Sequence, residues 1–336
     1  MVGKLTSNQI ATNCCNSTSA DPDVSPDYAG AVLMIGLAVA IIASNSLILV
    51  AILTYRKLRN NYDYLFVFSL SLCDVLVGLL NVPYEATVYI LWYPSPLTCA
   101  TLRAIQVTLK TANLFIVALI TLNKYIKIFY PFRYPFLVTG KTVCATLTFA
   151  WAFPVAWAAY AVQKLARAES VRVDMQCFQE KPPKQLAIVF FTMKFLLPAL
   201  FLLIGTTRIA LLVRDQHRRI ASLNVSATGQ ASEPSSGSMT SQQHLTKKEL
   251  HAVRLAASIA ATFLLFWCPI NIISLLTTLL CKRCGGQISI TITANVLRLS
   301  HLNSAINPIL YSLNKPLRAA CKQILKRQTG PLIVQE

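Results

Sequence analysis

Four polar side chains recur at helical spacing within one apolar stretch of the sequence. The intervals between them are three, four and three residues, which places all four on one face of a helix. They are Arg103, Gln106, Lys110 and Asn113. Ionisable groups inside apolar helices are costly to bury and are functional candidates by default. We therefore expect this face to look toward neighbouring helices, where its side chains find polar partners or contact a ligand.

Other ionisable residues occur in apolar stretches of the same kind. They are Asp74, Glu85, Lys194, Arg298 and His301. Because the basic groups outnumber the acids, one interpretation is a pocket for an anionic or acceptor-rich ligand held by Lys110 and Lys194. His301 either contacts that ligand or is hydrogen-bonded within the helical bundle.

The alternative interpretation of these charges is structural. It pairs Lys110 with Asp74, and it pairs Arg298 or Arg103 with Glu85. Buried ion pairs of this kind often serve the fold rather than a ligand. The sequence leaves the two interpretations open.

The composition points to the environment in which these residues lie. Of 336 residues, 54% are apolar and 13% are charged, whereas soluble domains carry about 25% charged residues. The formal net charge of +18 would suggest nucleic acid as a partner of a soluble chain. The mean hydropathy of +0.52 overrides that reading and indicates a membrane protein. No spaced set of His and carboxylate metal ligands and no Gly-rich phosphate loop is present, so we do not expect an enzyme.

Seven apolar segments are long enough to cross a hydrocarbon core of about 30 Å. They run over residues 29–55, 62–91, 99–129, 143–161, 185–213, 250–280 and 288–313. Each must be helical, since only helices and closed barrels satisfy the backbone in lipid, and the period-2 alternation of a barrel is missing. We predict an all-α membrane protein, a seven-transmembrane-helix bundle over residues 29–313.

The distribution of Lys and Arg predicts the orientation of this bundle. Basic residues collect in the connections after the first, third and fifth spans and in the C-terminal tail, which places that side in the cytosol. Residues 1–28 then form an extracellular tail, with a glycosylation sequon at Asn16 and no cleavable signal. Residues 214–248 form a flexible cytosolic loop.

Residues 314–336 follow the seventh span. They begin with a short amphipathic helix whose apolar face contains Leu317, Cys321, Ile324 and Leu325. We expect this eighth helix to lie along the inner leaflet. Cys321 is either acylated there or an unmodified thiol.

Polar and proline residues occur in the seven spans in a fixed order. The ordered set is Asn45, Ser71 to Asp74, Trp151, Pro198, Phe263 to Pro269 and Asn307-Pro308-Ile309-Leu310-Tyr311. This set closely resembles the rhodopsin-like G-protein-coupled receptors. The resemblance implies a plasma-membrane receptor that binds a small extracellular ligand and activates a heterotrimeric G protein. It also implies that Trp267 senses the agonist. The alternatives are a constitutive or non-coupling receptor and, in another class, a seven-helix transporter or channel with Asp74 and Lys110 as a charge relay.

The resemblance also implies a disulfide bond between Cys99, which opens the third span, and Cys177 in the second extracellular loop. Both cysteines lie on the predicted oxidising side. Cys281 and Cys284 lie on the same side and could bridge each other. A second bond is not specified, because connectivity cannot be deduced from sequence.

Some stretches are most similar to the adenosine receptors. They are Phe132-Arg133-Tyr134, Leu137 to Gly140, Cys281 to Cys284, Ser300 to Ser304 and the single residue Glu180. In those receptors the counterparts of Glu180, Ser300 and His301 contact the nucleoside.

Four positions bear on the identity of the ligand. Gln179 replaces the ring-stacking aromatic of the adenosine receptors, although Phe178 is adjacent, and Ser274 replaces the amide that grips the adenine edge. Lys110 replaces a small hydroxyl residue. Gln106 stands where amine receptors place a carboxylate. These differences argue against both adenosine itself and a monoamine.

Four oxygen-bearing residues match the positions that coordinate sodium in this family. They are Asp74, Asn113, Asn303 and Asn307. Asn113 replaces the usual serine, and oxygen ligands suit a hard cation. Lys110, one turn from Asn113, could instead supply the positive charge, so we expect a weakened sodium site.

The inner end of the third span departs from the family pattern. The family's Asp-Arg-Tyr is here Asn123-Lys124-Tyr125. Glu249 stands where some members pair with that arginine, so an acid–base lock between Lys124 and Glu249 is predicted. The remaining switch residues implied by the resemblance are Trp267, Asn307, Pro308 and Tyr311. The alternative is that Lys124 only joins the basic belt at the inner leaflet.

Overall fold

The computed structural model describes residues 27–89, 96–166, 188, 191–208, 210, 211, 214, 257–273, 275, 276 and 290–329. Within these residues the regular structure is helical. The helices are α2 (Tyr28–Thr54), α3 (Arg56–Arg59), α4 (Tyr62–Leu76), α5 (Val82–Tyr89), α6 (Pro96–Phe129), α7 (Tyr134–Leu137), α8 (Gly140–Ala166), α12 (Ile290–Ser312) and α13 (Lys315–Thr329). Shorter apolar helices, Leu197–Arg208 and Ala257–Ile273, lie within the predicted fifth and sixth spans. Every predicted span therefore contains helix.

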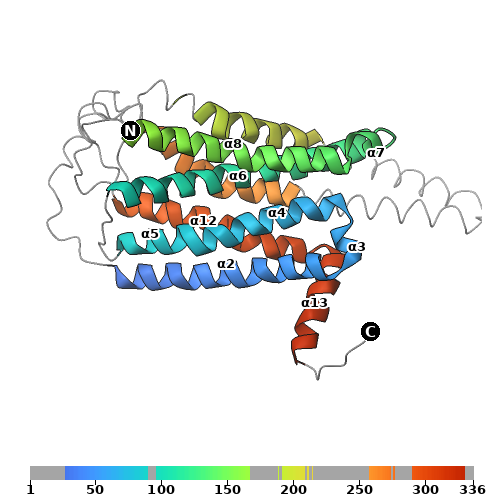
Figure 1. Ribbon diagram of the computed structural model, residues 1–336, viewed down its shortest axis with the longest axis horizontal. Coiled ribbons are helices and arrows are strands. Elements are labelled where there is room, and N and C mark those ends of the chain that lie inside the picture. Colours follow the sequence, from blue (N-terminus) through green and yellow to red (C-terminus); the bar gives the residue numbers. More distant parts are fainter. Residues whose placement is uncertain are drawn as a thin grey trace, which may run out of the picture.

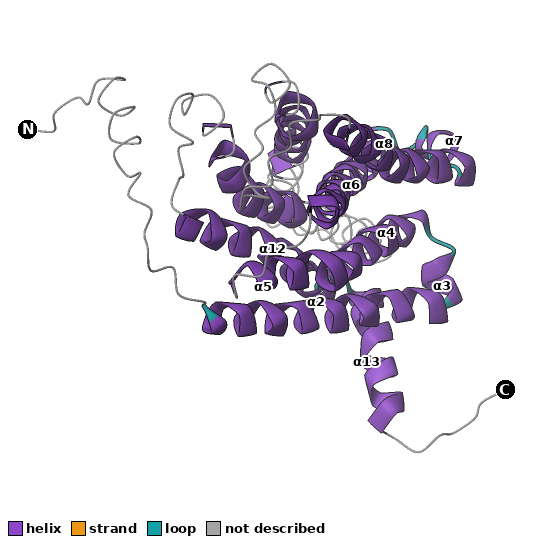
Figure 2. Cartoon of the chain, turned by 60° about the vertical axis from the view of Figure 1, so that its left-hand side comes forward, coloured by secondary structure: helices purple, strands orange, loops and turns teal. Residues whose placement is uncertain are grey.

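The long helices lie side by side in a bundle (Figure 1, Figure 2). Helix α2 packs against α4, α5 and α12, and α6 packs against α4 and α8. At 1.5 Å per residue, the 27 residues of α2 extend about 40 Å, enough to cross a bilayer core. In the described part of the chain, four helices are long and apolar enough to span a membrane: Tyr28–Thr54, Tyr62–Thr87, Ala104–Phe129 and Gly140–Tyr160.

The bundle is apolar on its outside and carries polar groups inside. Val39, Phe149 and Leu265 are at least 60% exposed, whereas Asn45, Asp74 and Asn307 are fully buried. This inversion of the pattern of soluble proteins is what lipid requires, because apolar side chains then face the hydrocarbon and polar groups find partners within the protein.

Among the described residues, two π-helical turns interrupt the spans. The first, Val77–Asn81, joins α4 to α5 and directly precedes Val82-Pro83; the second, Thr192–Leu196, precedes Leu197-Pro198. Proline has no N–H and its ring displaces the preceding carbonyl, so the helix adjusts its hydrogen bonding upstream. The first turn also sets the direction in which the acidic residue of α5, Glu85, enters the bundle.

Helix α13 turns away from the bundle beside α2 and α3 (Figure 1). Asn314 begins it by accepting a hydrogen bond from the Leu317 N–H at 3.4 Å, and the Tyr64 hydroxyl binds the same oxygen at 3.1 Å. Leu317 is buried and Leu325 is half exposed, as expected for an amphipathic helix. The thiol of Cys321 is free and half-buried, and burial raises its pKa.

Candidate functional site

One buried carboxylate organises the end of the bundle opposite α13. Glu85 of α5 is bonded by three side chains: the Gln106 amide donates to one carboxylate oxygen, Lys110 approaches that oxygen at 3.5 Å, and His301 lies 2.6 Å from the other. Glu85 and His301 are almost completely buried, and the Lys110 side chain is 11% exposed. Three helices, α5, α6 and α12, thus meet at one carboxylate.

Lys110 links this cluster to the sixth span. Its ammonium lies 5.6 Å from the centre of the Trp267 ring, within the range of a cation–π contact. Trp267 stacks on Phe263, with ring centres 5.5 Å apart, and its carbonyl accepts a hydrogen bond from Asn271. A ligand that displaces Lys110 would therefore alter the packing of Trp267.

The structure brings four predicted pocket residues into one region: Gln106, Lys110, Trp267 and His301. Ser300 is buried on α12 next to His301. The remaining predicted pocket residues are Phe178, Glu180 and Ser274, which lie outside the described residues, and Arg103 and Lys194, whose helical backbone alone is described. The predicted cysteines Cys177, Cys281 and Cys284 and the sequon at Asn16 also lie outside the described residues.

Two ion pairs of the structural interpretation have other partners in the structure, and the third, Arg103 with Glu85, involves a side chain outside the described residues. Lys110 pairs with Glu85 and not with Asp74, and Arg298 pairs with Asp27 at 2.8 Å and not with Glu85. Eleven residues separate Asp74 from Glu85, three turns along the second span, and only the partner at the depth of Lys110 is within reach. Glu85 itself was not predicted as a site residue, although an acid within an apolar span was the signal.

A second carboxylate, Asp74 of α4, lies deeper in the bundle. It accepts hydrogen bonds from Asn113 at 2.8 Å, Ser304 at 2.7 Å and Asn307 at 2.8 Å. Ser304 was not predicted. Asn303, predicted as a ligand, is buried beside Ser304 and has no hydrogen-bond partner in the part of the chain that the structure describes.

This second cluster has the chemistry of a site for a hard cation. The side-chain oxygens of Asn113, Asn303 and Asn307 are buried without a hydrogen-bond partner among the described residues. Asn113 and Asn307 direct their amide N–H groups at Asp74, and these three amide oxygens and the carboxylate are donors of the type that a hard cation binds. These residues therefore fit sodium by donor type.

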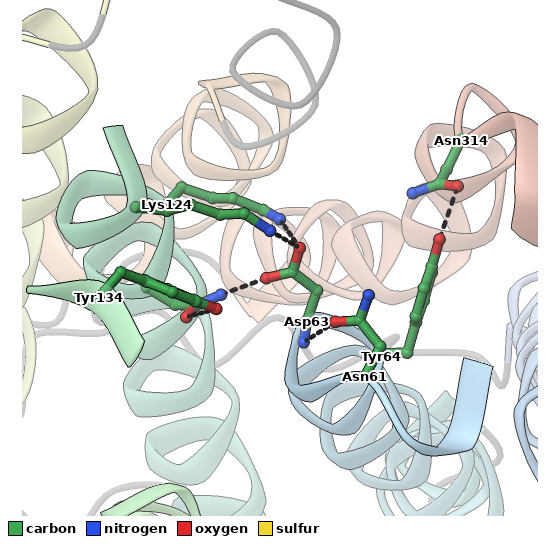
Figure 3. Close-up of polar contacts among 8 residues, drawn as sticks. Asn61, Asp63, Tyr64, Lys124, Tyr134 and Asn314 are labelled. Carbon is green, nitrogen blue, oxygen red and sulfur yellow. Dashed lines mark hydrogen bonds and ion pairs between the residues drawn. The ribbon is translucent and has the colours of Figure 1, made fainter. Parts of the chain in front are cut away.

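A third carboxylate organises the α13 end. Asp63, in the first turn of α4, accepts from Lys124 at 2.7 Å, Lys127 at 3.1 Å and Asn123 at 2.5 Å, all on α6 (Figure 3). The Tyr134 hydroxyl of α7 donates to the side-chain amide oxygen of Asn123 at 3.1 Å. Burial, followed by the negative charge of Asp63, raises the pKa of Tyr134 to about 12.

The predicted switch residues divide between described and undescribed positions. Lys124 has an acidic partner, but that partner is Asp63; Glu249 lies outside the described residues, so the predicted Lys124–Glu249 pair stays a prediction. Tyr311 is fully buried near the end of α12, three residues after Pro308. Tyr125 stacks on Phe129 of its own helix.

The fold and these clusters define a helical membrane protein that carries polar, ionisable centres inside an apolar bundle. Its sequence matches the profile described as 7 transmembrane receptor (rhodopsin family) over residues 44–311. The chain belongs to this family, which consists of receptors rather than enzymes. It is a multi-pass plasma-membrane protein, and the predicted seven-helix, rhodopsin-like architecture is confirmed.

Similar proteins include receptors for three amines. The chain is 26% identical to a D(1)-like dopamine receptor of Takifugu rubripes, covering 84% of this chain and 66% of that receptor. It is 26% identical to octopamine receptor beta-1R of Drosophila melanogaster, covering 85% of this chain and 59% of that receptor. It is 27% identical to the human histamine H2 receptor, covering 84% of this chain and 75% of that receptor. The chain thus spans less than two thirds of the length of the first two. The similarity to adenosine receptors stays a prediction.

Proposed function

We propose that this chain is a G-protein-coupled receptor that binds a small extracellular ligand at the cluster of Glu85, Lys110 and His301. The observation that carries the proposal is the contact between the buried cluster and the sixth span, Lys110 over Trp267. A ligand that binds one arrangement of Lys110 better than another shifts the bundle between two states, and only this difference in affinity drives activation. The family membership supports this function over a transporter or channel.

An anionic or acceptor-rich ligand suits this cluster. Amines are named for the relatives, but Gln106 replaces the carboxylate that amine receptors of this family place on the third span. Glu85 has both oxygens engaged by three donors, so an amine would have to displace Lys110 or His301 to reach it. A ligand carboxylate or carbonyl can instead accept from Lys110, whose 3.5 Å approach to Glu85 is long for an ion pair.

The test is a signalling screen of surface-verified receptor with cyclic AMP and calcium readouts. The ligand panel contains nucleosides, organic anions and the amines dopamine, octopamine and histamine. Once an agonist is found, Lys110→Gln is compared with Lys57→Gln, which removes the same charge from an exposed position of α3. We expect an organic anion to activate the parent receptor and Lys57→Gln, and to act weakly on Lys110→Gln. Activation by an amine, unaffected by Lys110→Gln, would overturn the ligand assignment.

The transducer surface of the proposed receptor lies around α7. Phe132 is 91% exposed and Phe136 is 82% exposed, next to the ionic network of Asp63. Exposed large apolar side chains on a water-facing loop are characteristic of protein interaction sites. We expect the G protein to contact these two rings, and Phe132→Ala to reduce agonist-stimulated nucleotide exchange without altering agonist affinity measured in the absence of G protein.

Sodium is a second proposed ligand of the receptor. The buried side-chain oxygens of Asn113, Asn303 and Asn307, which have no hydrogen-bond partner among the described residues, support it. Lys110, which could have replaced the ion, has Glu85 as a partner. The expected result is that sodium chloride raises the melting temperature of purified parent receptor more than choline chloride does, and that Asp74→Asn abolishes the difference. Equal effects of both salts on the parent would exclude the site.

A further inference from the structure

Asp63 joins three elements through one carboxylate. It belongs to α4, its ion pairs and amide contact come from α6, and Asn123 passes the connection on to Tyr134 of α7 (Figure 3). Its own backbone N–H is bonded to Asn61, the residue that caps α4. This contact holds the backbone of Asp63 at the start of α4 and limits how far its carboxylate can follow Lys124 if α6 changes its position.

The two lysines bound by Asp63 are not equivalent. Lys124 approaches the carboxylate at 2.7 Å with 13% of its side chain exposed, whereas Lys127 approaches at 3.1 Å with 47% exposed. An ion pair screened from water is costlier to break than an exposed one, because the freed charges are left partly desolvated. The Asp63–Lys124 pair is thus the stronger of the two contacts.

A cavity adjoins this pair. Its lining includes Asp63 and Lys124 together with Ile259 of the sixth span and Asn314 at the start of α13. The carboxylate is the acidic partner of Lys124 on this lining, and it holds the ammonium against α4. If the pair opens, the stem of Lys124 is free to place its charge in this cavity, which is lined by the second, third and sixth spans and by Asn314.

We propose that Asp63 is a latch that keeps Lys124 against α4 in the resting receptor and anchors the loop segment α7. Opening of the latch releases Lys124 into the cavity and loosens the segment that carries Phe132 and Phe136. The acid of this latch comes from the second span, while the position before Lys124 is the amide Asn123. The functional part of this inference rests on the proposed coupling to a G protein.

The test compares four single variants of the full chain: Asp63→Asn, Asp63→Glu, Lys124→Gln and the matched control Lys127→Gln. The first readout is hydrogen–deuterium exchange of purified receptor in nanodiscs, which requires neither ligand nor G protein. We expect Asp63→Asn and Lys124→Gln to speed exchange over residues 123–137 about tenfold, and Lys127→Gln to change it less than twofold. Asp63→Glu, which retains the charge, should restore much of the protection.

The second readout is agonist-independent nucleotide exchange on a panel of co-expressed G proteins. Asp63→Asn and Lys124→Gln should raise it about tenfold over the parent at equal surface density, with little change for Lys127→Gln. Equal rates of deuterium exchange in Lys124→Gln and Lys127→Gln, measured in nanodiscs, would overturn the latch. This comparison does not depend on whether Asp63→Asn folds. Faster deuterium exchange with no G-protein activation by parent or variants would support the latch and overturn the proposed coupling.

Discussion

Two acids of the second span, Glu85 and Asp63, face the third span at opposite ends of the bundle. They are 22 residues apart, roughly 33 Å along a helix, which is close to the thickness of the hydrocarbon core. Glu85 is enclosed by an amide, an imidazole and one lysine, and its side chain is 4% exposed. Asp63, 17% exposed, binds two lysines at the water boundary. The same residue class thus forms a closed cluster at one end and an openable one at the other.

The difference lies in what happens to the charges when a contact is broken. In the Glu85 cluster, loss of the acid leaves Lys110 charged and without its carboxylate inside the bundle, and breaking such buried pairs costs about 3 to 5 kcal/mol. At Asp63, Lys127 is 47% exposed and its pair contributes only about 0.2 to 1 kcal/mol, while the pair with Lys124, 13% exposed, is costlier to break but lies at the water boundary. The first arrangement favours a fixed geometry for a ligand, and the second favours a switch.

Removal of the buried acid should have the largest effect. We expect Glu85→Ala to lower the melting temperature strongly and to reduce surface expression, because Lys110 and His301 both lose their shared partner. Lys110→Met in the same chain should recover part of the loss, since it removes the stranded charge. The measurement is a thermal shift of detergent-purified receptor. If Glu85→Ala has the melting temperature of the parent, the Glu85 cluster is not costlier to break than the Asp63 cluster.

The ligand contact of Lys110 should come next in size. For an anionic agonist, Lys110→Gln should weaken binding about ten- to a hundredfold, corresponding to the roughly 1.5 to 3 kcal/mol of a charge-assisted hydrogen bond. Lys110→Arg should keep part of the affinity. Radioligand or fluorescent-ligand binding measures this. An agonist affinity that is the same in the parent, Lys110→Gln and Lys110→Arg would mean that Lys110 has only a structural role.

The sequence predicts the fold and only part of these clusters. Apolar length and the ordered polar residues identify the spans, and the amides around Asp74 follow from the family resemblance. The partners of Lys110 and Arg298 cannot be predicted from the sequence, because pairing between helices depends on the depth of each residue in the bundle and on the rotation of each helix about its axis. A π-helical turn precedes Glu85, and Asp27, the partner of Arg298, lies just before the first span as the N-cap of α2. Neither feature is visible as a periodic pattern.

A smaller effect is expected for Tyr134→Phe, which removes the hydrogen bond to Asn123 at the α13 end. One neutral hydrogen bond contributes about 0.5 to 1.5 kcal/mol. The pKa of Tyr134 is raised to about 12 from the ordinary 10, so the folded state favours the neutral phenol. This stabilisation is fully present below pH 10 and is lost as the pH rises toward 12. The parent should therefore melt higher than Tyr134→Phe at pH 7, and the difference should shrink above pH 10. A constant difference from pH 7 to 11.5 would rule out ionisation of Tyr134 as the cause.

The smallest effect is expected at the ion pair outside both clusters, Asp27 with Arg298. The Gly30 N–H, and then Arg298, lower the pKa of Asp27. Stabilisation by the carboxylate is therefore present above its ordinary pKa of 3.8 and is lost as the pH falls through the lower folded value.

Gly30 offers a way to break the pair without touching either charge, because a methyl group there would overlap the Arg298 guanidinium and the Asp27 carboxylate. Gly30→Ala and Arg298→Gln should each lower the melting temperature slightly at pH 7, and the double variant should be no worse than the stronger single one, since both remove the same contact. Additive losses in this thermal-shift comparison would mean that Gly30 and Arg298 act separately, and that the tie between the first and seventh spans is not made by this ion pair.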